Sequence, residues 1–419
     1  MKKTLLIILC GLILYSCSKD ETVTNYLESN KGNTSNYRTL AEALQIAQDA
    51  ASMVNDSVET RAASRTRIVD TKNVRVITSP GTRSFSANND TLLYVLNYED
   101  EKGFAVVSAN KATEGLLAVT EDGSYEESSD AYHDTGISNF MELAKSYATR
   151  GPEDSLEVDF FIPIDTIYTT KGPLISVKWG QRYPEGKYCP NLRSGCAVTA
   201  AAQIFSYYKH PTSIALTYPN ADINNQVLDW DEMRKHILYY TPNGMCTIQY
   251  CLANDSAHNM IGRLCRQLGH LSDMEYYTEP DTASATDRML IWYAILNSGY
   301  SCPLWDEYIT GKAHQNIQYN KPVLFSGGDV VSWKRHIWIV DGYKKMTVRY
   351  TTLHPDRPPF SRITYYNHIN WGWNGRNNGY FLDNIFDTQN YQNLDSSPYS
   401  TVNINFTHEI RYCVPQPDI

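Results

Sequence analysis

Several features that mark common protein classes are absent from this chain of 419 residues. There is no long basic run and the formal net charge is −9, so nucleic acid is not an expected partner. There is no Cys-x-x-Cys pair, and the cysteine spacings do not suggest zinc. We find no internal repeat. What remains is a globular composition, with 42% hydrophobic and 20% charged residues, long enough for two or more domains.

The apolar run at the N-terminus is too short to span a bilayer as an ordinary helix. "MKKTLLIILCGLILYSC" has a basic start and then about a dozen apolar residues, which predicts a signal peptide over residues 1–17. Its end, "LYSC", resembles a bacterial lipoprotein signal, and the "SKDE" that follows resembles the export tag of surface lipoproteins in the Bacteroidota. The resemblance implies lipidation of Cys17. We therefore expect an exported lipoprotein, anchored at the outer membrane or cell surface of a Gram-negative bacterium.

The first third of the chain lacks the residues that catalysis usually needs. Residues 18–38 are polar and predict a tether. Residues 39–160 predict a small α+β domain, with helices over 40–54 and 137–150 and two strands over 92–110 around a turn at Gly103. This domain contains no Cys and only one His, His133. The charged segment 151–159 predicts a boundary.

Cysteine and tryptophan become frequent beyond that boundary, and every Trp lies at or after Trp179. Residues 161–419 predict a second α+β domain, because helical patterns come first and strand-like segments follow. The expected helices begin at Cys196 and cover 258–271 and 287–300. Expected strands include 321–328, 336–345, 363–373, 379–386 and 401–414. We predict a turn at Asp341-Gly342.

Cys196 opens a helical pattern in "SGCAVTAAAQIFSYYKHP", which ends where His210 precedes Pro211. The unpaired N–H groups of a first helical turn carry partial positive charge and favour a thiolate. A buried Cys is also often a plain core residue, and this stretch alone leaves both interpretations open.

Three further segments carry suitable partners for a thiolate. His336 opens the strand "HIWIVDGY" and is a candidate base. In "HINWGWNG", Asn370 or the backbone at Trp371 is placed to accept from the imidazole Nδ1–H and fix its tautomer. Gln181 precedes the cysteine and is a candidate oxyanion donor together with the Cys196 N–H. Each segment taken alone also fits a structural role.

The order Gln, Gly-Cys-helix, His-strand, Asn-Trp-Gly-Trp resembles a papain-like cysteine peptidase, and more closely the streptopain-type family of streptococci and Bacteroidota. The segments that carry this resemblance are "PLISVKWGQRYPEGKYCP", "GCAVTAAAQIFSYYKHP", "LCRQLG", "KPVLFSGG…HIWIVDGY" and "HINWGWNG…NGYF". The first domain resembles the inhibitory propeptide of the family in "LYVLNYEDEKGFAVVSANK" and "GLLAVTEDGSY". Two differences are Arg335 and Ile337, where the family has Gly and Ala. Residues 346–362 look like an insertion.

The resemblance implies a two-lobed peptidase domain behind an inhibitory propeptide. It further implies a secreted cysteine endopeptidase made as a zymogen, acting on protein or peptide substrates without metal or cofactor. In this interpretation Cys196 is the nucleophile, His336 transfers the proton, Gln181 stabilises the oxyanion, and Asn370 or Trp371 orients His336. Activation is expected through a cut between about Arg150 and Lys171.

Two other functions fit parts of the same pattern. One is a surface binding lipoprotein that kept the fold and lost activity, as Arg335 and Ile337 would suggest. The other is a different Cys–His acyl-transfer enzyme, such as an amidase or a transglutaminase-like protein. A complete propeptide favours the peptidase, because a peptidase must be kept silent during export.

Overall fold

The structure is a computed structural model. It describes residues 36–55, 67–79, 91–125, 135–149, 161–236, 239–240, 246–247, 252–277, 284–329, 335–352, 358–388 and 408–418. The predicted signal peptide with Cys17, most of the predicted tether, His133 and the segment 151–159 lie outside these residues.

The N-terminal domain is a helix–sheet unit, as the sequence predicts. Its elements are α2 (Leu40–Asn55), β1 (Val69–Thr78), β2 (Thr91–Tyr98), η1 (Glu99–Glu101), β3 (Phe104–Ser108), β4 (Leu116–Thr120) and α3 (Thr135–Ala148). A capping box fixes the start of α2: the Thr39 N–H donates to the Glu42 carboxylate at 2.6 Å, and the Glu42 N–H donates to Thr39 Oγ1 at 3.3 Å. The predicted helices and the strand pair around Gly103 are confirmed.

A helical lobe follows the cysteine. It contains α4 (Cys196–Tyr208), α5 (Trp230–Met233), α6 (Asp255–Leu271) and α7 (Arg288–Leu296), with the short pairs β6 (Ser213–Ala215) with β7 (Asn225–Val227) and β8 (Tyr239–Tyr240) with β9 (Cys246–Thr247). Asn254 and Asp287 cap α6 and α7 by accepting a backbone N–H each. The helices predicted here are therefore confirmed, with α7 ending before the predicted limit.

The C-terminal part is mostly strand. Its elements are β5 (Phe161–Lys171), β10 (Tyr300–Ser301), β11 (Asp306–Glu307), α8 (Lys312–Gln318), β12 (Val323–Asp329), β13 (Arg335–Thr352), β14 (Phe360–Asn370), β15 (Gly379–Leu382), η4 (Asp383–Phe386), β16 (His408–Cys413) and β17 (Gln416–Pro417).

One local prediction in this part is wrong. Asp341-Gly342 is not a turn, because β13 runs through both residues and only shifts register between Val340 and Gly342. Most of residues 346–362, which look like an insertion in the sequence, extend β13 and β14, and β5 pairs along the same stretch of β13. A bulge thus replaces the predicted turn.

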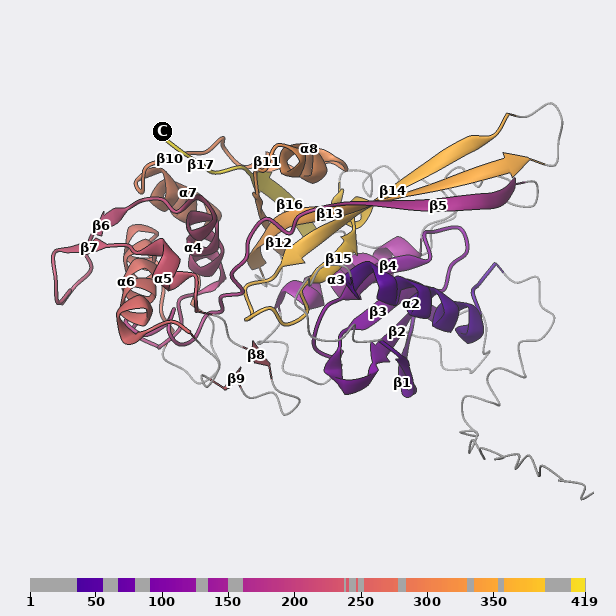
Figure 1. Ribbon diagram of the computed structural model, residues 1–419, viewed down its shortest axis with the longest axis horizontal. Helices are drawn as coiled ribbons and strands as arrows, with labels where there is room; N and C mark the ends of the chain where they lie inside the picture. Colours follow the sequence, from indigo (N-terminus) through magenta and orange to yellow (C-terminus); the bar gives the residue numbers. More distant parts are fainter. Residues whose placement is uncertain are drawn as a thin grey trace, which may run out of the picture.

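One sheet joins the two domains. Its order is β1-β2-β3-β4-β15-β14-β13-β12-β16-β11, with β5 beside β13 (Figure 1). The N-terminal strands thus extend the sheet of the C-terminal domain through the pair β4–β15. The helices α4 to α7 form a separate lobe at the other end of the molecule (Figure 1). This confirms the predicted α+β class and its two lobes.

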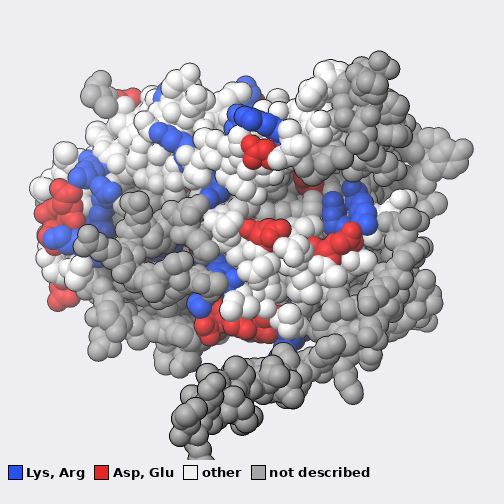
Figure 2. Space-filling view, turned by 45° about the vertical axis from the view of Figure 1, so that its right-hand side comes forward, with Lys and Arg blue, Asp and Glu red and all other residues white. Residues whose placement is uncertain are grey.

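Two hydrophobic cores match this division. One contains the N-terminal domain together with the inner face of the shared sheet, and the other fills the helical lobe around α4. The surface in Figure 2 carries small groups of Lys and Arg next to small groups of Asp and Glu. Among the described residues, no helix is both long and apolar enough to cross a membrane.

Candidate active site

Cys196 is the first residue of α4, and Gly195 before it has a φ of 85°. A Cβ at Gly195 would lie 2.9 Å from Met274 Cε, so both the left-handed backbone and the close packing require glycine. Of the five described free cysteines, Cys196 is half-buried and the others are buried. Cys196 is thus the described free cysteine that keeps partial exposure to solvent.

The expected thiolate is not the favoured form in this structure. Burial raises the pKa of the Cys196 thiol above its ordinary value. The backbone N–H groups of Ile337, Ala197 and Cys196 lower it, as a helix N-terminus should, but burial outweighs them. Ile337 follows His336, so the thiol contacts the backbone of the strand that carries the predicted base.

His336 lies near the start of β13 and is fully buried. Its Nε2–H donates to the Trp371 carbonyl oxygen at 2.9 Å. The nitrogen is Nε2, not the predicted Nδ1, so in the neutral ring Nδ1 is the basic nitrogen. The ring lies nearly parallel to Trp338 and Trp373, with centroids 6.1 Å and 6.2 Å away. Burial among these indoles lowers the pKa of His336 to about 4.

Helix α3 of the N-terminal domain covers this imidazole. A Cβ built at Gly136, in the first turn of α3, would lie 3.0 Å from His336 Cδ2 and 2.3 Å from Trp371 Cε3. Only a glycine lets the helix backbone pass this closely over the two rings. The N-terminal domain thus packs directly against His336.

Gln181 is buried on the loop before α4. Its backbone carbonyl accepts from the Ser194 N–H at 2.8 Å, two residues before Cys196. The preceding Gly180 N–H donates to Glu185 Oε1 at 3.1 Å, and burial raises the pKa of that carboxyl to about 8. The structure therefore brings the Gln181 loop against the segment that carries the cysteine.

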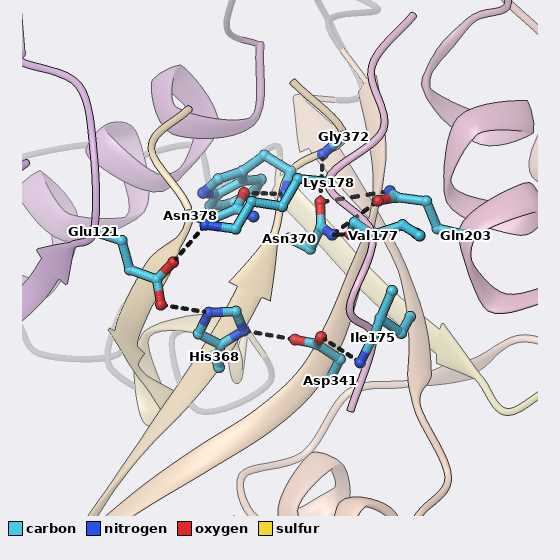
Figure 3. Close-up of polar contacts among 11 residues, drawn as sticks. Glu121, Ile175, Val177, Lys178, Gln203, Asp341, His368, Asn370, Gly372 and Asn378 are labelled. Carbon is cyan, nitrogen blue, oxygen red and sulfur yellow. Dashed lines mark hydrogen bonds and ion pairs between the residues drawn. The ribbon is translucent and has the colours of Figure 1, made fainter. Parts of the chain in front are cut away.

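Asn370 does not contact His336 among the described hydrogen bonds. Its Oδ1 accepts from the Gly372 N–H at 3.0 Å, and its Nδ2 donates to Gln203 Oε1 at 2.9 Å (Figure 3). Of the two groups that the sequence offered for His336, the Trp371 carbonyl is the one in contact.

Two residues of α4 that sequence analysis missed hold the Gln181 loop. Gln203 Oε1 accepts from the Trp179 N–H at 3.0 Å, and Thr199 Oγ1 donates to the Gly180 carbonyl at 2.9 Å. They lie one turn apart on α4 and are both fully buried. Two polar residues at this spacing in an Ala-rich buried helix were the available signal.

Arg335 points away from the imidazole. Its guanidinium contacts Glu409 at 3.0 Å, and Arg288 contacts the same carboxylate at 2.7 Å. Among the described residues, no group of three or more His, Cys, Asp or Glu side chains could hold a metal ion.

Comparison with known proteins agrees with this geometry. Residues 179–381 match the model of the peptidase C10 family, and residues 30–148 match that of the Spi protease inhibitor. The chain carries a peptidase C10 domain behind an inhibitor domain. It is therefore a cysteine-type endopeptidase, and the inhibitor domain implies a zymogen.

The relatives are consistent with this family. Streptopain from Streptococcus pyogenes serotype M28 is 24% identical over 322 residues, which cover 69% of this chain and 73% of the relative. Among solved structures, a Prevotella intermedia prointerpain A fragment aligns with a TM-score of 0.48 and 19% identity, over 81% of this chain and 98% of that one. Active interpain A from the same species aligns with a TM-score of 0.37 and 17% identity, over 59% and 94%.

Proposed function

We propose that this peptidase is exported and lipid-anchored, that Cys196 and His336 carry its catalysis, and that the N-terminal domain keeps it latent. One observation supports the catalytic pair above the others. The Cys196 thiol lies at the start of α4 beside the Ile337 N–H, while the adjacent His336 is held by the Trp371 carbonyl. These contacts support a nucleophile, a base and a group that orients the base, drawn from three distant segments.

Catalysis follows the chemistry of these groups. The Cys196 thiol gives its proton to His336 Nδ1, and the sulfur attacks the carbonyl carbon of the scissile bond. His336 then delivers that proton to the leaving amine, and the acyl-thioester forms. Water hydrolyses the thioester, with His336 taking a proton from the water and returning it to the sulfur. The Trp371 carbonyl keeps the ring in one tautomer throughout.

Gln181 and the Cys196 N–H are the proposed donors to the tetrahedral oxyanion. The support for Gln181 is its place on a loop braced to α4 through Ser194. Loss of one such donor costs about a hundred- to a thousand-fold in turnover, which is the loss expected for Gln181→Ala. Unchanged turnover would assign Gln181 a structural role only.

In the full-length chain, Cys196 and His336 are not in the protonation states that this chemistry needs. The pKa of Cys196 lies above its ordinary value and that of His336 lies at about 4, so both groups are neutral at pH 7. Burial is the largest cause in each case. Departure of α3 would return water to His336, raise its pKa and favour the thiolate–imidazolium pair.

The test is maturation of purified full-length protein, followed by mass spectrometry and peptide hydrolysis. We expect the wild-type chain to become active as a C-terminal fragment accumulates, and Cys196→Ala to stay full-length. His336→Ala should lose activity by more than tenfold while keeping its fold. An uncleaved chain as active as its fragment would contradict latency, and an active His336→Ala variant would contradict the assignment of the base.

The activating cut is proposed between Arg150 and Phe161, a narrower range than the sequence gives. Lys171, the other limit, pairs with Tyr343 in the β5–β13 ladder. Proteases cut extended, accessible backbone, so a bond inside a paired strand is a poor site. Mass spectrometry of the mature fragment checks this, because its first residue should lie before or at Phe161.

The lipid anchor at Cys17 is supported by the signal-like sequence alone. Two acyl chains hold a protein stably on a membrane, so wild-type protein should sediment with membranes. Cys17→Ala should release it into the soluble fraction. Wild-type protein that is wholly soluble would rule out the anchor.

A further inference from the structure

A group of charges, buried except for the partly exposed Lys178, lies where the inhibitor domain meets the peptidase domain, outside the catalytic site. Strand β4 pairs with β15, with Thr120 opposite Gly379 and Ala118 opposite Phe381. The Glu121 N–H extends this pairing by donating to the Asn378 carbonyl at 2.7 Å. The inhibitor strand therefore carries the Glu121 side chain directly into the peptidase domain.

Four side chains form what we call the junction charge cluster: Glu121, Lys178, Asp341 and His368. Glu121 contacts His368 Nε2 at 3.3 Å with one carboxylate oxygen and Lys178 Nζ at 3.1 Å with the other (Figure 3). His368 Nδ1 contacts Asp341 Oδ1 at 2.6 Å on its far side. Asp341 Oδ2 accepts from the Ile175 N–H at 3.1 Å. The His368 ring is thus held between carboxylates of the two domains.

The cluster is balanced only when the domains are together. His368, Asp341 and Glu121 are all less than 10% exposed. The peptidase domain contributes the cations Lys178 and His368 but only one carboxylate, Asp341. When His368 is protonated, Asp341 offsets only one of these two cations, and a second carboxylate is needed to balance the cluster. Glu121 supplies it in this chain.

The surroundings add no second buried carboxylate among the described contacts. Asp122 lies 3.9 Å from Lys178 Nζ, and its side chain is half exposed. The Tyr380 ring packs edge-on against His368 at 5.2 Å, and Lys344 Nζ lies 5.1 Å from the centroid of that tyrosine. Apart from the half-exposed Asp122, these neighbours therefore add no negative charge to the site.

We propose that the β15 edge, with Lys178 and His368, is a binding site for an extended segment that bears a carboxylate just beyond its last paired residue. In the zymogen the segment is 116–121 and the carboxylate is that of Glu121. The peptidase domain thereby recognises its inhibitor domain by charge as well as by shape. The effect of this site on activity rests on the proposed latency. The binding site itself rests only on the contacts described above.

The junction charge cluster makes the binding of the inhibitor domain depend on pH. Burial opposes charge on His368, but Asp341 and Glu121 outweigh it and raise the pKa of His368 to about 10. Burial would likewise raise the pKa of Glu121, but Lys178 and His368 outweigh it and hold that pKa well below its usual range. Separation of the domains would remove one carboxylate from His368 and return Glu121 to water.

These two pKa shifts determine how the binding of the inhibitor domain changes with pH. The Glu121 contribution is complete above the ordinary glutamate pKa of about 4.3 and is lost as the pH falls below it. The His368 contribution is complete below the pKa of that residue in the separated domains, and it is lost as the pH rises toward about 10. The inhibitor domain is therefore held most tightly between about pH 5 and the pKa of His368 in the separated domains.

The test compares Glu121→Gln with the matched control Asp122→Asn, which removes the neighbouring exposed carboxylate. In a full-length Cys196→Ala background, amide hydrogen exchange over residues 118–121 reports opening of the junction at pH 6. We expect Glu121→Gln to speed this exchange about tenfold and Asp122→Asn to change it less than twofold. Lys178→Met should act in the same direction as Glu121→Gln.

With Cys196 intact, Glu121→Gln should also mature about tenfold faster at pH 6, and the difference should narrow toward pH 9 as His368 loses its proton in the opened chain. Unchanged exchange in Glu121→Gln, or equal acceleration by Asp122→Asn, would overturn the proposal. A wild-type chain that is active without cleavage would instead overturn the proposed latency. The exchange measurement still decides the binding site in that case.

Discussion

At the scale of single residues, the amide of Gln203 connects the three parts of the catalytic site. Its Oε1 accepts from the Trp179 N–H at 3.0 Å and from Asn370 Nδ2 at 2.9 Å. Trp179 leads into the Gln181 loop, and Asn370 precedes the Trp371 carbonyl that holds His336. Gln203 itself lies two turns after Cys196 on α4. One amide oxygen thus links the helix that begins at Cys196 with the segments that carry Gln181 and the Trp371 carbonyl.

Gln203→Leu should therefore lower turnover more than it lowers substrate binding. The substitution leaves the buried Trp179 N–H without an acceptor, which costs about 1–3 kcal/mol, and leaves Asn370 Nδ2 only the Val177 carbonyl. A displacement of about 1 Å between reacting groups can cost about a hundred-fold in rate. We expect kcat of the matured enzyme to fall between tenfold and a hundred-fold with KM changed less than threefold. Gln203→Glu keeps an acceptor and should lose less.

A matched control is Gln267 on α6, another buried amide that accepts a backbone N–H, here from Thr217 at 2.8 Å. Gln267→Leu should lower the melting temperature as Gln203→Leu does but leave kcat unchanged. Equal loss of kcat in both variants would mean that Gln203 acts only through stability.

The residues proposed for catalysis could be singled out from sequence because their types are rare and their local signals are strong. Cys196 opens a helix, His336 opens a strand and Trp371 lies between a strand and a glycine. The nitrogen that binds Trp371 could not be predicted, since it depends on how the turn meets β13. Gln203 and Thr199 were missed because the helical spacing of an Ala-rich stretch predicts that the helix is buried. It does not predict which hydrogen bonds its polar residues make.

At the scale of elements, helix α3 is the part of the inhibitor domain that touches the base. Its first turn passes over His336 and Trp371 at Gly136, where a Cβ would come within 2.3 Å of the indole. Gly136→Ala should push α3 away from the rings. Alanine is the better helix former by about 1 kcal/mol, so the helix itself should not be weakened. We expect the full-length chain to react with iodoacetamide at Cys196 at least several-fold faster.

Ser138→Ala is the control for this helix, because Ser138 is exposed on α3 and the change adds no atom at the junction. It should leave the alkylation rate within twofold of wild type. A Gly136→Ala chain that reacts no faster than the control would show that α3 does not limit access to the thiol.

Element boundaries were predicted best where local signals decide them. The Thr39–Glu42 capping box starts α2, and Gly103 turns β2 into β3. The length of β13 could not be predicted, because Asp341-Gly342 has the composition of a turn. What carries the strand through these residues is pairing with β14 and β5, which lie far away in sequence. Tertiary pairing outweighs local preference there.

At the scale of the whole molecule, the inhibitor domain is part of the peptidase architecture. The β4–β15 pair makes one sheet of the two domains, and a single hydrophobic core runs across the junction. Phe140 of α3 packs edge-on against Phe381 of β15 with centroids 4.8 Å apart. Arg362 of β14 forms an ion pair with Glu114 beside β4. None of these contacts depends on the covalent link near residue 150.

Cleavage of that link should therefore not be enough for full activity. A tether keeps the inhibitor domain at an effective concentration of about millimolar, and a cut replaces this by the actual protein concentration. We expect a Cys196→Ala chain, cut by a trace of active enzyme, to elute as one complex of two fragments at micromolar concentration. In the active chain, peptide hydrolysis per molecule should rise on dilution after the cut, and again when the N-terminal fragment is degraded. Fragments that separate at once at micromolar concentration, with activity independent of dilution, would contradict this, and they would mean that the shared sheet holds the inhibitor domain only through its tether.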